Sequence, residues 1–484
     1  MKRVKNLPWS GVGLTLLLGA CSLAPPLKTP VVPTADAYKE MGPWTRAEPA
    51  DRLPHDSWWM LYDNTELDEL QKTLIDGNPT LAAALANYAQ ARALADQARA
   101  GLFPTLGLSA GVARNRDSLD RPLRLSGGPA YYDTNSLGGS VSYELDLWGQ
   151  IRNEVAAGEA NAAASAADLE NARLSLIAQL VDDYVQLRSL DRDSAILDET
   201  VQAYTRAVGL TQQRHDAGIA PGLDVSQAQT QLDAARSQAA QTLAQRALME
   251  HAIAALLGVS ASTFSIKPQI VDLKLPQIPT GLPSTLLQRR PDIAGAQRRM
   301  IAANANIGVA RAAYFPSLTL GAQAGFESKG FSNWLSAPSA FWAVGPNALL
   351  SVFDGGLRRA QVAQARAEFD ASAANYRGIV VGAFQQVEDS LAALNHYHEA
   401  GVDEKAAVDA AQRTLDFSTA LYKQGATDYL TVVTSQTALL QAQLQALSLD
   451  TLQLTASVNL IRALGGGWQD FAASHTQYTS RRQA

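Results

Sequence analysis

The chain of 484 residues contains two successive copies of one sequence pattern. The motifs Phe103-Pro104-Thr105-Leu106 and Phe315-Pro316-Ser317-Leu318 are offset by 212 in residue number (315 − 103), as are Asn78-Pro79 and Arg290-Pro291. Three further pairs of landmarks have offsets of 206 or 207: Val181-Asp182-Asp183 and Val387-Glu388-Asp389, Gly218 and Gly425, Leu257-Gly258 and Leu464-Gly465. Five matches in the same order at nearly constant spacing indicate a tandem duplication of a unit of about 200 residues.

Each copy is expected to contain a helix, a strand, a loop, a strand, a very long helix, a tight turn and a helix. In the first copy these cover residues 79–101, 104–112, 117–135, 137–147, 151–215, 218–222 and 223–257. In the second they cover 292–313, 316–326, 329–339, 341–353, 357–424, 425 and 429–464. The first repeat is therefore placed at 78–259 and the second at 291–467, with a proline-rich linker at 260–290 and a tail at 468–484.

The long helices are the second unusual feature. A helix over 357–424 would extend about 100 Å at a rise of 1.5 Å per residue. Small residues dominate it, as in AQVAQARAEFDASAA, and apolar positions recur at spacings of three and four. Such helices cannot stand alone, so they are expected to pack as a coiled bundle or a helical barrel.

All four expected strands alternate between an apolar and a polar face. Their lengths suit a membrane barrel, and aromatic residues near their ends suit an interfacial girdle; a soluble hairpin packed on helices is the alternative. Four strands cannot close a barrel, and two copies would leave room inside for side chains only. Three copies give twelve strands and a water-filled lumen lined by Glu144 and Asp146, so a homotrimer is expected.

The first twenty residues combine three basic side chains with an apolar run that ends in Leu18-Gly19-Ala20-Cys21, the layout of a secretion signal at 1–20. The motif resembles the lipoprotein box, in which the cysteine is acylated, for example with palmitate, and becomes the new N-terminus. Residues 21–77 would then form a lipid-anchored extension, and Ser22 implies the outer membrane. As the only cysteine, Cys21 excludes an internal disulfide. The net charge of −6, without a basic block, gives no sign of nucleic-acid binding.

Between about Trp58 and Trp468 the chain resembles the outer-membrane factor family, the TolC/OprM-like exit ducts, in its lipoprotein branch. The resemblance rests on WWMLYDNTELDEL, LPSTLLQRRPDIAGAQ, AAYFPSLTLGA, VFDGG, YKQGATDYLTV and VNLIRALGGGW. It implies an α+β membrane channel, in which a trimeric twelve-stranded outer-membrane barrel, with four strands from each chain, continues into a long periplasmic helical barrel. The implied function is a passive conduit of a tripartite efflux pump, without cofactor, docked to a periplasmic adaptor and an inner-membrane transporter of the resistance-nodulation-division type.

In this family the hairpin tips close the periplasmic end, and here they would be residues 214–226 and 421–434. Leu430 matches the leucine that narrows the pore, and Thr434 replaces a frequent aspartate, so Asp428 is a candidate for the missing charge; packing and solvation are the plainer interpretations of Leu430 and Asp428. Candidates for polar contacts that hold the tips together are Tyr422, Lys423, Arg214, Asp216 and Asp224.

Two other classes of function remain as alternatives. An enzyme is disfavoured because no catalytic or metal-binding spacing occurs: His396 and His398 are the only close histidines, and their spacing directs them to different helix faces. A structural periplasmic coiled-coil lipoprotein would not need four alternating strands. Within the transport class, the sequence does not distinguish drug efflux from export of metal ions, an oligosaccharide or a polypeptide.

Overall fold

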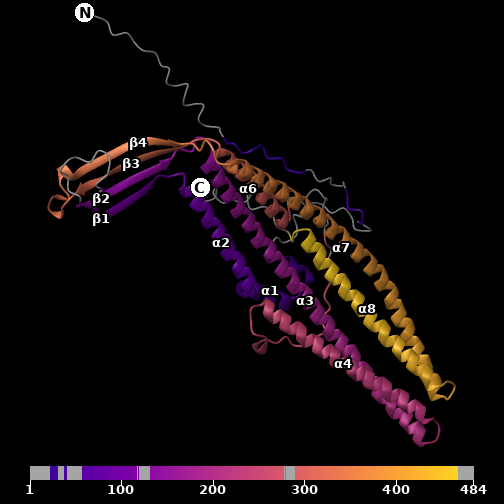
Figure 1. Ribbon diagram of the computed structural model, residues 1–484. Coiled ribbons are helices and arrows are strands. Elements are labelled where there is room, and N and C mark those ends of the chain that lie inside the picture. Colours follow the sequence, from indigo (N-terminus) through magenta and orange to yellow (C-terminus); the bar gives the residue numbers. More distant parts are fainter. Residues whose placement is uncertain are drawn as a thin grey trace, which may run out of the picture. The chain divides into compact units, whose positions relative to one another are not determined.

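The computed structural model describes residues 22–30, 37–40, 57–116, 118, 131–276, 278 and 289–466. The expected signal sequence, Cys21 and the tail at 468–484 lie outside these ranges. Two compact units are present. Unit 1 draws its residues from 1–30, 87–165 and 296–376, and unit 2 from 31–86, 166–295 and 377–484. Unit 1 contains the sheet, and unit 2 contains both helical hairpins (Figure 1).

The helices of the two repeats have matching lengths. Helices α2 (Pro79–Ala100) and α6 (Pro291–Ala312) have 22 residues, α3 (Gln150–Asp216) and α7 (Leu357–Lys423) have 67, and α4 (Gly222–Leu256) and α8 (Tyr429–Ala463) have 35. Gly218 and Gly425 take positive φ values of 69° and 74° in the turns of the two hairpins, as a tight reversal after a helix requires. Shorter helices occur at α1 (Thr65–Gly77), η1 (Trp58–Tyr62) and η2 (Ala261–Thr263).

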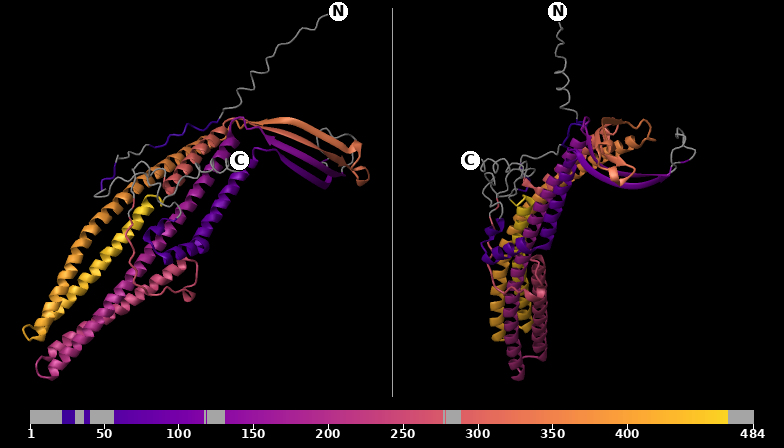
Figure 2. Two further views of the ribbon diagram at one scale, coloured as in Figure 1. Left: turned by 180° about the vertical axis from the view of Figure 1, so that it is seen from behind. Right: turned by 90° about the vertical axis from the view of Figure 1, so that its left-hand side faces the viewer.

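The sheet consists of four antiparallel strands in the order β1 (Thr105–Arg116), β2 (Tyr131–Glu144), β3 (Ser317–Ser328) and β4 (Ala340–Leu349). Figure 2 shows that it is curved. The register makes one face apolar from edge to edge, since one row across the strands contains Leu106, Val141, Ala322 and Val344. The neighbouring row on the other face contains Gly107, Ser140, Gln323 and Ala343. Leu106 and Leu108 are 80% and 87% exposed, so the described residues leave the apolar face uncovered at β1.

The strand limits differ from those expected. Strands β1 and β3 reach further toward their loops than 112 and 326, and β2 begins at Tyr131, inside the segment expected to be a loop. Strand β2 ends at Glu144 rather than 147, and β4 ends at Leu349 rather than 353. The earlier end of β4 has a simple cause: Leu349 pairs with Ser317, the first residue of β3, so no strand of the described ranges lies beside the residues after Leu349. The expected loop at 329–339 contains two short helices, η3 (Phe331–Asn333) and η4 (Ala337–Ser339).

Asp146 follows β2 rather than lying within it, which corrects the expected strand limit; its place in a barrel lumen stays a prediction. Its carboxylate accepts hydrogen bonds from the backbone N–H groups of Ile151 and Arg152 at 3.1 and 2.9 Å, and so caps the first turn of α3. Asp354 does the same ahead of α7, where it accepts from the Arg358 N–H at 3.3 Å. Glu144 is the last residue of β2 and lies exposed on the polar face.

In each repeat, one side chain at the start of the first helix donates a hydrogen bond to the end of the last helix, within unit 2. The Asn78 amide donates to the carbonyl of Leu256, near the end of α4, at 2.7 Å. Arg290 occupies the equivalent place in the second repeat and donates to the carbonyl of Ala463 at 3.0 Å. These bonds satisfy carbonyls that a helix end leaves unpaired. In the described ranges no helix combines the length and the apolar character needed to cross a membrane.

Candidate functional site

The tips of the two hairpins meet through one polar cluster in unit 2. The Tyr422 hydroxyl, in the last turns of α7, donates to the Asp224 carboxylate in the first turn of α4 at 3.1 Å. Arg214, near the end of α3, places its guanidinium 4.8 Å from the centre of the Tyr422 ring. It also donates to the carbonyl of Lys423 at 3.4 Å. We refer to Arg214, Asp224, Tyr422 and Lys423 as the tip cluster.

A small apolar core supports the tip cluster. Tyr422 and Tyr429 are 4% and 2% exposed, their ring centres are 5.2 Å apart, and Ala228 and Val432 pack beside them. Burial raises the pKa of the Tyr422 hydroxyl, and the nearby Asp224 carboxylate raises it further. Tyr422 therefore remains protonated at neutral pH and stays a hydrogen-bond donor. Burial also raises the pKa of Tyr429 to about 12.

The other sequence-predicted gate residues lie outside this cluster. Leu430 is 54% exposed at the start of α8, and the Thr434 hydroxyl donates to the carbonyl of Leu430 at 2.9 Å, within their own helix. Asp216 accepts a hydrogen bond of 2.8 Å from the Gln212 amide. An exposed leucine at a hairpin tip is free to meet a second chain, so the role of Leu430 in narrowing a pore stays a prediction.

Asp428 caps a helix within its own hairpin. Its carboxylate accepts from the backbone N–H of Thr431 at 3.1 Å and from the Thr431 hydroxyl at 2.7 Å, and so caps the N-terminus of α8. These hydrogen bonds lower the pKa of Asp428. The charge is therefore present at neutral pH. It is engaged with its own helix, and its role in place of an acid at Thr434 stays a prediction.

Sequence reasoning missed Tyr429, Ala228 and Val432, which hold the tip cluster in place. It also missed that Arg214 stacks on Tyr422 rather than pairing with a carboxylate. The available signal was the pair Tyr422 and Tyr429 on either side of Gly425. Two large aromatic residues next to a tight turn pack together when the turn brings their helices side by side.

A second group of contacts marks the junction between helices and strands in unit 1. The Trp148 ring stacks on Phe315 with a centroid distance of 4.7 Å, and its N–H donates to the carbonyl of Pro316 at 2.8 Å. Pro316 directly precedes β3 and Trp148 follows β2, so this contact fixes the point at which both strands leave the helices. Amphipathic aromatic residues at such a position are typical of a membrane interface.

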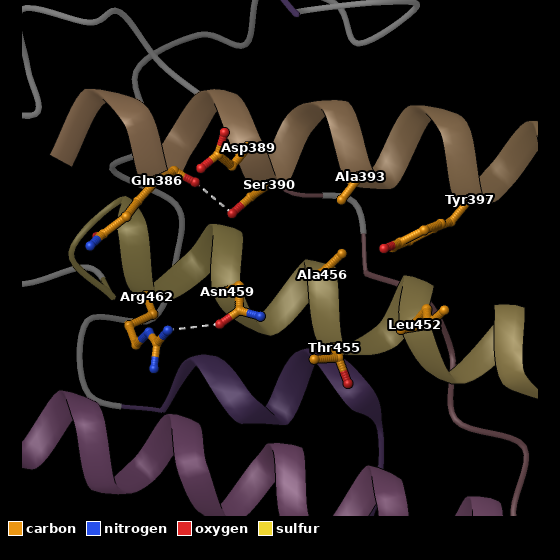
Figure 3. A pocket seen from close by; sticks show the side chains of 10 residues that line it. All are labelled: Gln386, Asp389, Ser390, Ala393, Tyr397, Leu452, Thr455, Ala456, Asn459 and Arg462. Carbon is orange, nitrogen blue, oxygen red and sulfur yellow. Dashed lines mark hydrogen bonds between the residues drawn. The ribbon is translucent and has the colours of Figure 1, made fainter. Parts of the chain in front are cut away.

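Unit 2 also contains a cavity of about 390 Å³ between α7 and α8 (Figure 3). Its lining contains one acid, Asp389, and one base, Arg462, which donates to the Asn459 amide oxygen at 2.9 Å. The lining residues are Gln386, Asp389, Ser390, Ala393, Tyr397, Leu452, Thr455, Ala456, Asn459 and Arg462. The Ser390 hydroxyl donates to the carbonyl of Gln386 at 2.7 Å, within its own helix. Across the described ranges, no three histidine, cysteine or acidic side chains gather as a metal site.

A model of the family described as outer membrane efflux protein matches residues 70–259 and 282–466. The chain belongs to this family. It is 32% identical over 467 residues to the probable efflux pump outer membrane protein TtgC of Pseudomonas putida, with 96% of each chain covered. It is 33% identical over 476 residues to the pyoverdine export outer membrane protein OpmQ of Pseudomonas aeruginosa, covering 96% of this chain and 98% of that protein.

Among solved structures, the outer-membrane channel OprN matches with a TM-score of 0.86 and 30% identity, covering 93% of this chain and all of that one. The resemblance to this family and the α+β channel fold predicted from the sequence are thereby confirmed. The family is one of outer-membrane channel proteins.

Proposed function

We propose that this chain is the outer-membrane exit channel of a tripartite efflux pump. In this proposal three copies form a passive conduit, which docks to a periplasmic adaptor and to an inner-membrane transporter of the resistance-nodulation-division type. The conduit performs no chemistry and needs no cofactor. The exported compounds are drugs or other small molecules, and the transporter supplies the energy.

The single observation that carries this proposal is the sheet with two unlike faces. One face presents an apolar row that includes Leu106 and Val344, and the other presents glycine, serine and glutamine, including Ser140 and Gln323. A strand that alternates in this way separates lipid from water in an outer-membrane barrel. Strands β1 and β4 are open edges, and closure by further copies removes such edges. The homotrimer follows because three copies supply twelve strands.

The lipid anchor on Cys21 belongs to the same proposal. Residues just after Cys21 are held against α3 and α6 in unit 1: the Ser22 hydroxyl donates to the Asn153 amide oxygen at 2.9 Å, and Arg311 donates to the carbonyl of Leu23 at 3.1 Å. Gly308 allows this approach, since an added Cβ would lie 2.8 Å from the Ala24 nitrogen. A lipid on Cys21 would enter the membrane beside the start of the strands. Incorporation of labelled palmitate, and its loss in Cys21→Ser, tests this part.

The named relatives support two substrate classes. Relatives named for toluene and antibiotic efflux support export of drug-like compounds. The relative named for pyoverdine export supports pyoverdine or a similar compound as a second candidate. Because the transporter selects the substrate, both classes are compatible with one conduit.

The proposal is tested by expressing the chain, together with a periplasmic adaptor and a transporter of the resistance-nodulation-division type, in a strain that lacks its own outer-membrane efflux channels. The expected result is lower accumulation of a fluorescent efflux substrate than with adaptor and transporter alone. Unchanged accumulation, with the chain present in the outer membrane, would contradict the proposal. A control strain with the chain but without the transporter should accumulate the dye fully, since a passive conduit cannot drive export.

A further inference from the structure

The apolar face of the sheet ends in basic side chains at the strand ends far from the helices. Along this face β1 presents, in order, Leu106, Leu108, Ala110, Val112, Arg114 and Arg116. In the neighbouring strand, Asp133 lies opposite Arg114, and Tyr131 lies opposite Arg116. One face of one strand therefore changes from aliphatic to cationic over its last two outward-facing positions.

The distance along β1 at which the arginines appear matches the height of an apolar membrane band. Arg114 follows Leu106 by 8 residues (114 − 106), and Arg116 follows it by 10 (116 − 106). At about 3.4 Å per residue and a strand tilt of about 40°, these steps rise about 21 and about 26 Å along the membrane normal. The apolar band of an outer-membrane barrel is about 25 Å tall. Because the proposed function places the helices in the periplasm, both arginines lie at the headgroup level of the outer leaflet.

Acidic side chains compensate these two arginines only weakly. The Arg114 Nε lies 3.9 Å from the Asp133 carboxylate, and the two side chains are 78% and 56% exposed. The Arg116 guanidinium lies 5.4 Å from the centre of the Tyr131 ring, and it has no acidic partner among the described residues. Exposed ion pairs of this kind contribute little. Both guanidinium groups therefore retain N–H donors for a further anion.

The arginines that flank the other end of the sheet are paired within the chain. Arg152 lies at the start of α3, and its Nε is 3.1 Å from the carboxylate of Asp146, which caps that helix. Arg358 at the start of α7 pairs in the same way with Asp354. Cations without a close carboxylate are thus found, among the described residues of the sheet and its helix junctions, at the end far from the helices.

We propose that Arg114 and Arg116 bind the phosphate groups of lipid A, the phosphorylated glucosamine lipid of the outer leaflet. A guanidinium group donates paired hydrogen bonds to phosphate oxygens. Same-face neighbours on a strand lie about 7 Å apart, so both arginines can reach one headgroup. The acyl chains of the same lipid would lie along Leu108 and Val112, which are 87% and 68% exposed. This proposal rests on the proposed function, because it requires the sheet to cross the outer membrane.

Asp133 provides a second expectation of opposite sign. Its carboxylate shares the face of the two arginines, where it repels a phosphate and competes for Arg114. Asp133→Asn removes the negative charge and keeps a side chain of the same size. This variant should therefore bind lipid A more tightly than the natural chain.

Binding of lipid A to the purified full-length chain tests the proposal. Fluorescent lipid A with two phosphates is titrated in mild detergent against the natural chain, Arg114→Gln with Arg116→Gln, and Asp133→Asn. The control variant, Arg206→Gln with Arg236→Gln, removes the same charge from exposed positions on α3 and α4 of unit 2. Dephosphorylated lipid A and inorganic phosphate are the control ligands. Melting temperatures without lipid A check that each variant is folded.

The expected result is a Kd about tenfold higher for Arg114→Gln with Arg116→Gln, since each basic residue near an anionic membrane surface contributes severalfold. Asp133→Asn should lower the Kd, and the control variant should leave it unchanged. Dephosphorylated lipid A should bind weakly to every form, and inorganic phosphate at equal concentration should not displace lipid A.

Three results would overturn the proposal: an unchanged Kd in Arg114→Gln with Arg116→Gln, an equal rise in the control variant, or equal affinity for dephosphorylated lipid A. Displacement by inorganic phosphate would also overturn it, because the site would then bind free phosphate rather than the lipid. The proposed function has a separate readout, since accumulation of the efflux substrate is measured on the natural chain. A chain that exports but binds lipid A independently of the two arginines would contradict this inference alone.

Discussion

Tyr422 of α7 donates a hydrogen bond of 3.1 Å to Asp224 of α4, so the end of one helical hairpin is tied to the start of the other. The donor is buried beneath its own hairpin turn, and Arg214 covers its ring. This contact connects the two repeats at their tips. In a conduit that closes at this end, any movement that separates the hairpins must break it.

Replacing Tyr422 with phenylalanine should therefore loosen the tips. The change removes the hydroxyl and keeps the ring, so it costs about 1 kcal/mol, which corresponds to about a fivefold higher open population. Single-channel recording in planar bilayers measures this population. Tyr429→Phe is the matched control, because Tyr429 lies in the same core and its hydroxyl makes no hydrogen bond to the described residues. Equal open populations for the two variants would show that the Tyr422 hydroxyl does not stabilise the closed state.

Leu430 makes a separate prediction, because it is exposed rather than packed in its own chain. If it narrows the pore, Leu430→Ala should raise single-channel conductance and sensitivity to vancomycin, with little effect on stability. Leu243, 55% exposed in α4 and outside the hairpin tips, is a matched control. Unchanged conductance and sensitivity in Leu430→Ala would exclude Leu430 from the constriction.

Asp182 predicts a pH dependence of stability. Burial raises its pKa to about 7, against the opposing effect of Arg462, and its Oδ1 has no hydrogen-bond partner among the described residues. A carboxyl group with a raised pKa in the folded state destabilises the fold as pH rises from the unfolded pKa near 4 to about 7. Asp182→Asn should therefore raise the melting temperature at pH 8 by about 2 °C or more, and leave it unchanged at pH 4. The same rise at both pH values would contradict this account.

Asp191 predicts a large structural effect away from the tips. Its carboxylate is 2% exposed and accepts hydrogen bonds from Arg188, Arg246 and the Gln269 N–H at 2.6, 2.7 and 3.1 Å. Removing one partner leaves buried charges unpaired, so Asp191→Asn should cost about 3 kcal/mol. Asp233→Asn is the control, since its ion pair with Arg236 is exposed and should contribute less than about 1 kcal/mol. Melting temperatures of both variants in detergent measure the difference, and equal values would show that the buried network contributes nothing.

The helices and the order of elements could be predicted from the sequence because both are local and repeated. Helix α8 begins at Tyr429 as expected, and α7 begins at Leu357. Strand ends were less predictable, since they depend on what lies beside them. The pattern of β4 continues to Phe353, but its neighbour β3 begins only at Ser317, opposite Leu349. The alternating pattern therefore extends beyond the part of β4 that has a neighbouring strand among the described residues.

The candidate site was predictable in part for a similar reason. Tyr422, Asp224, Arg214 and Lys423 could be placed at the tips from the position of the turns, and the structure brings these four together. Asp146 was misplaced because an aspartate at an alternating position continues a strand pattern as well as it caps a helix. In the structure Asp146 caps α3, because its carboxylate accepts from the N–H groups of Ile151 and Arg152. The direction of these N–H groups depends on the turn at Gly149.

The central claim is that the chain conducts passively without the other pump components. Single-channel recording of the purified chain in a planar bilayer, with no adaptor, transporter or nucleotide present, tests it most directly. The account predicts discrete current steps that scale linearly with voltage, small for the natural chain and larger for Asp224→Ala combined with Tyr422→Phe. If neither the natural chain nor the double variant gives current steps, although protein is recovered from the bilayer, the result would contradict channel function and favour a structural lipoprotein.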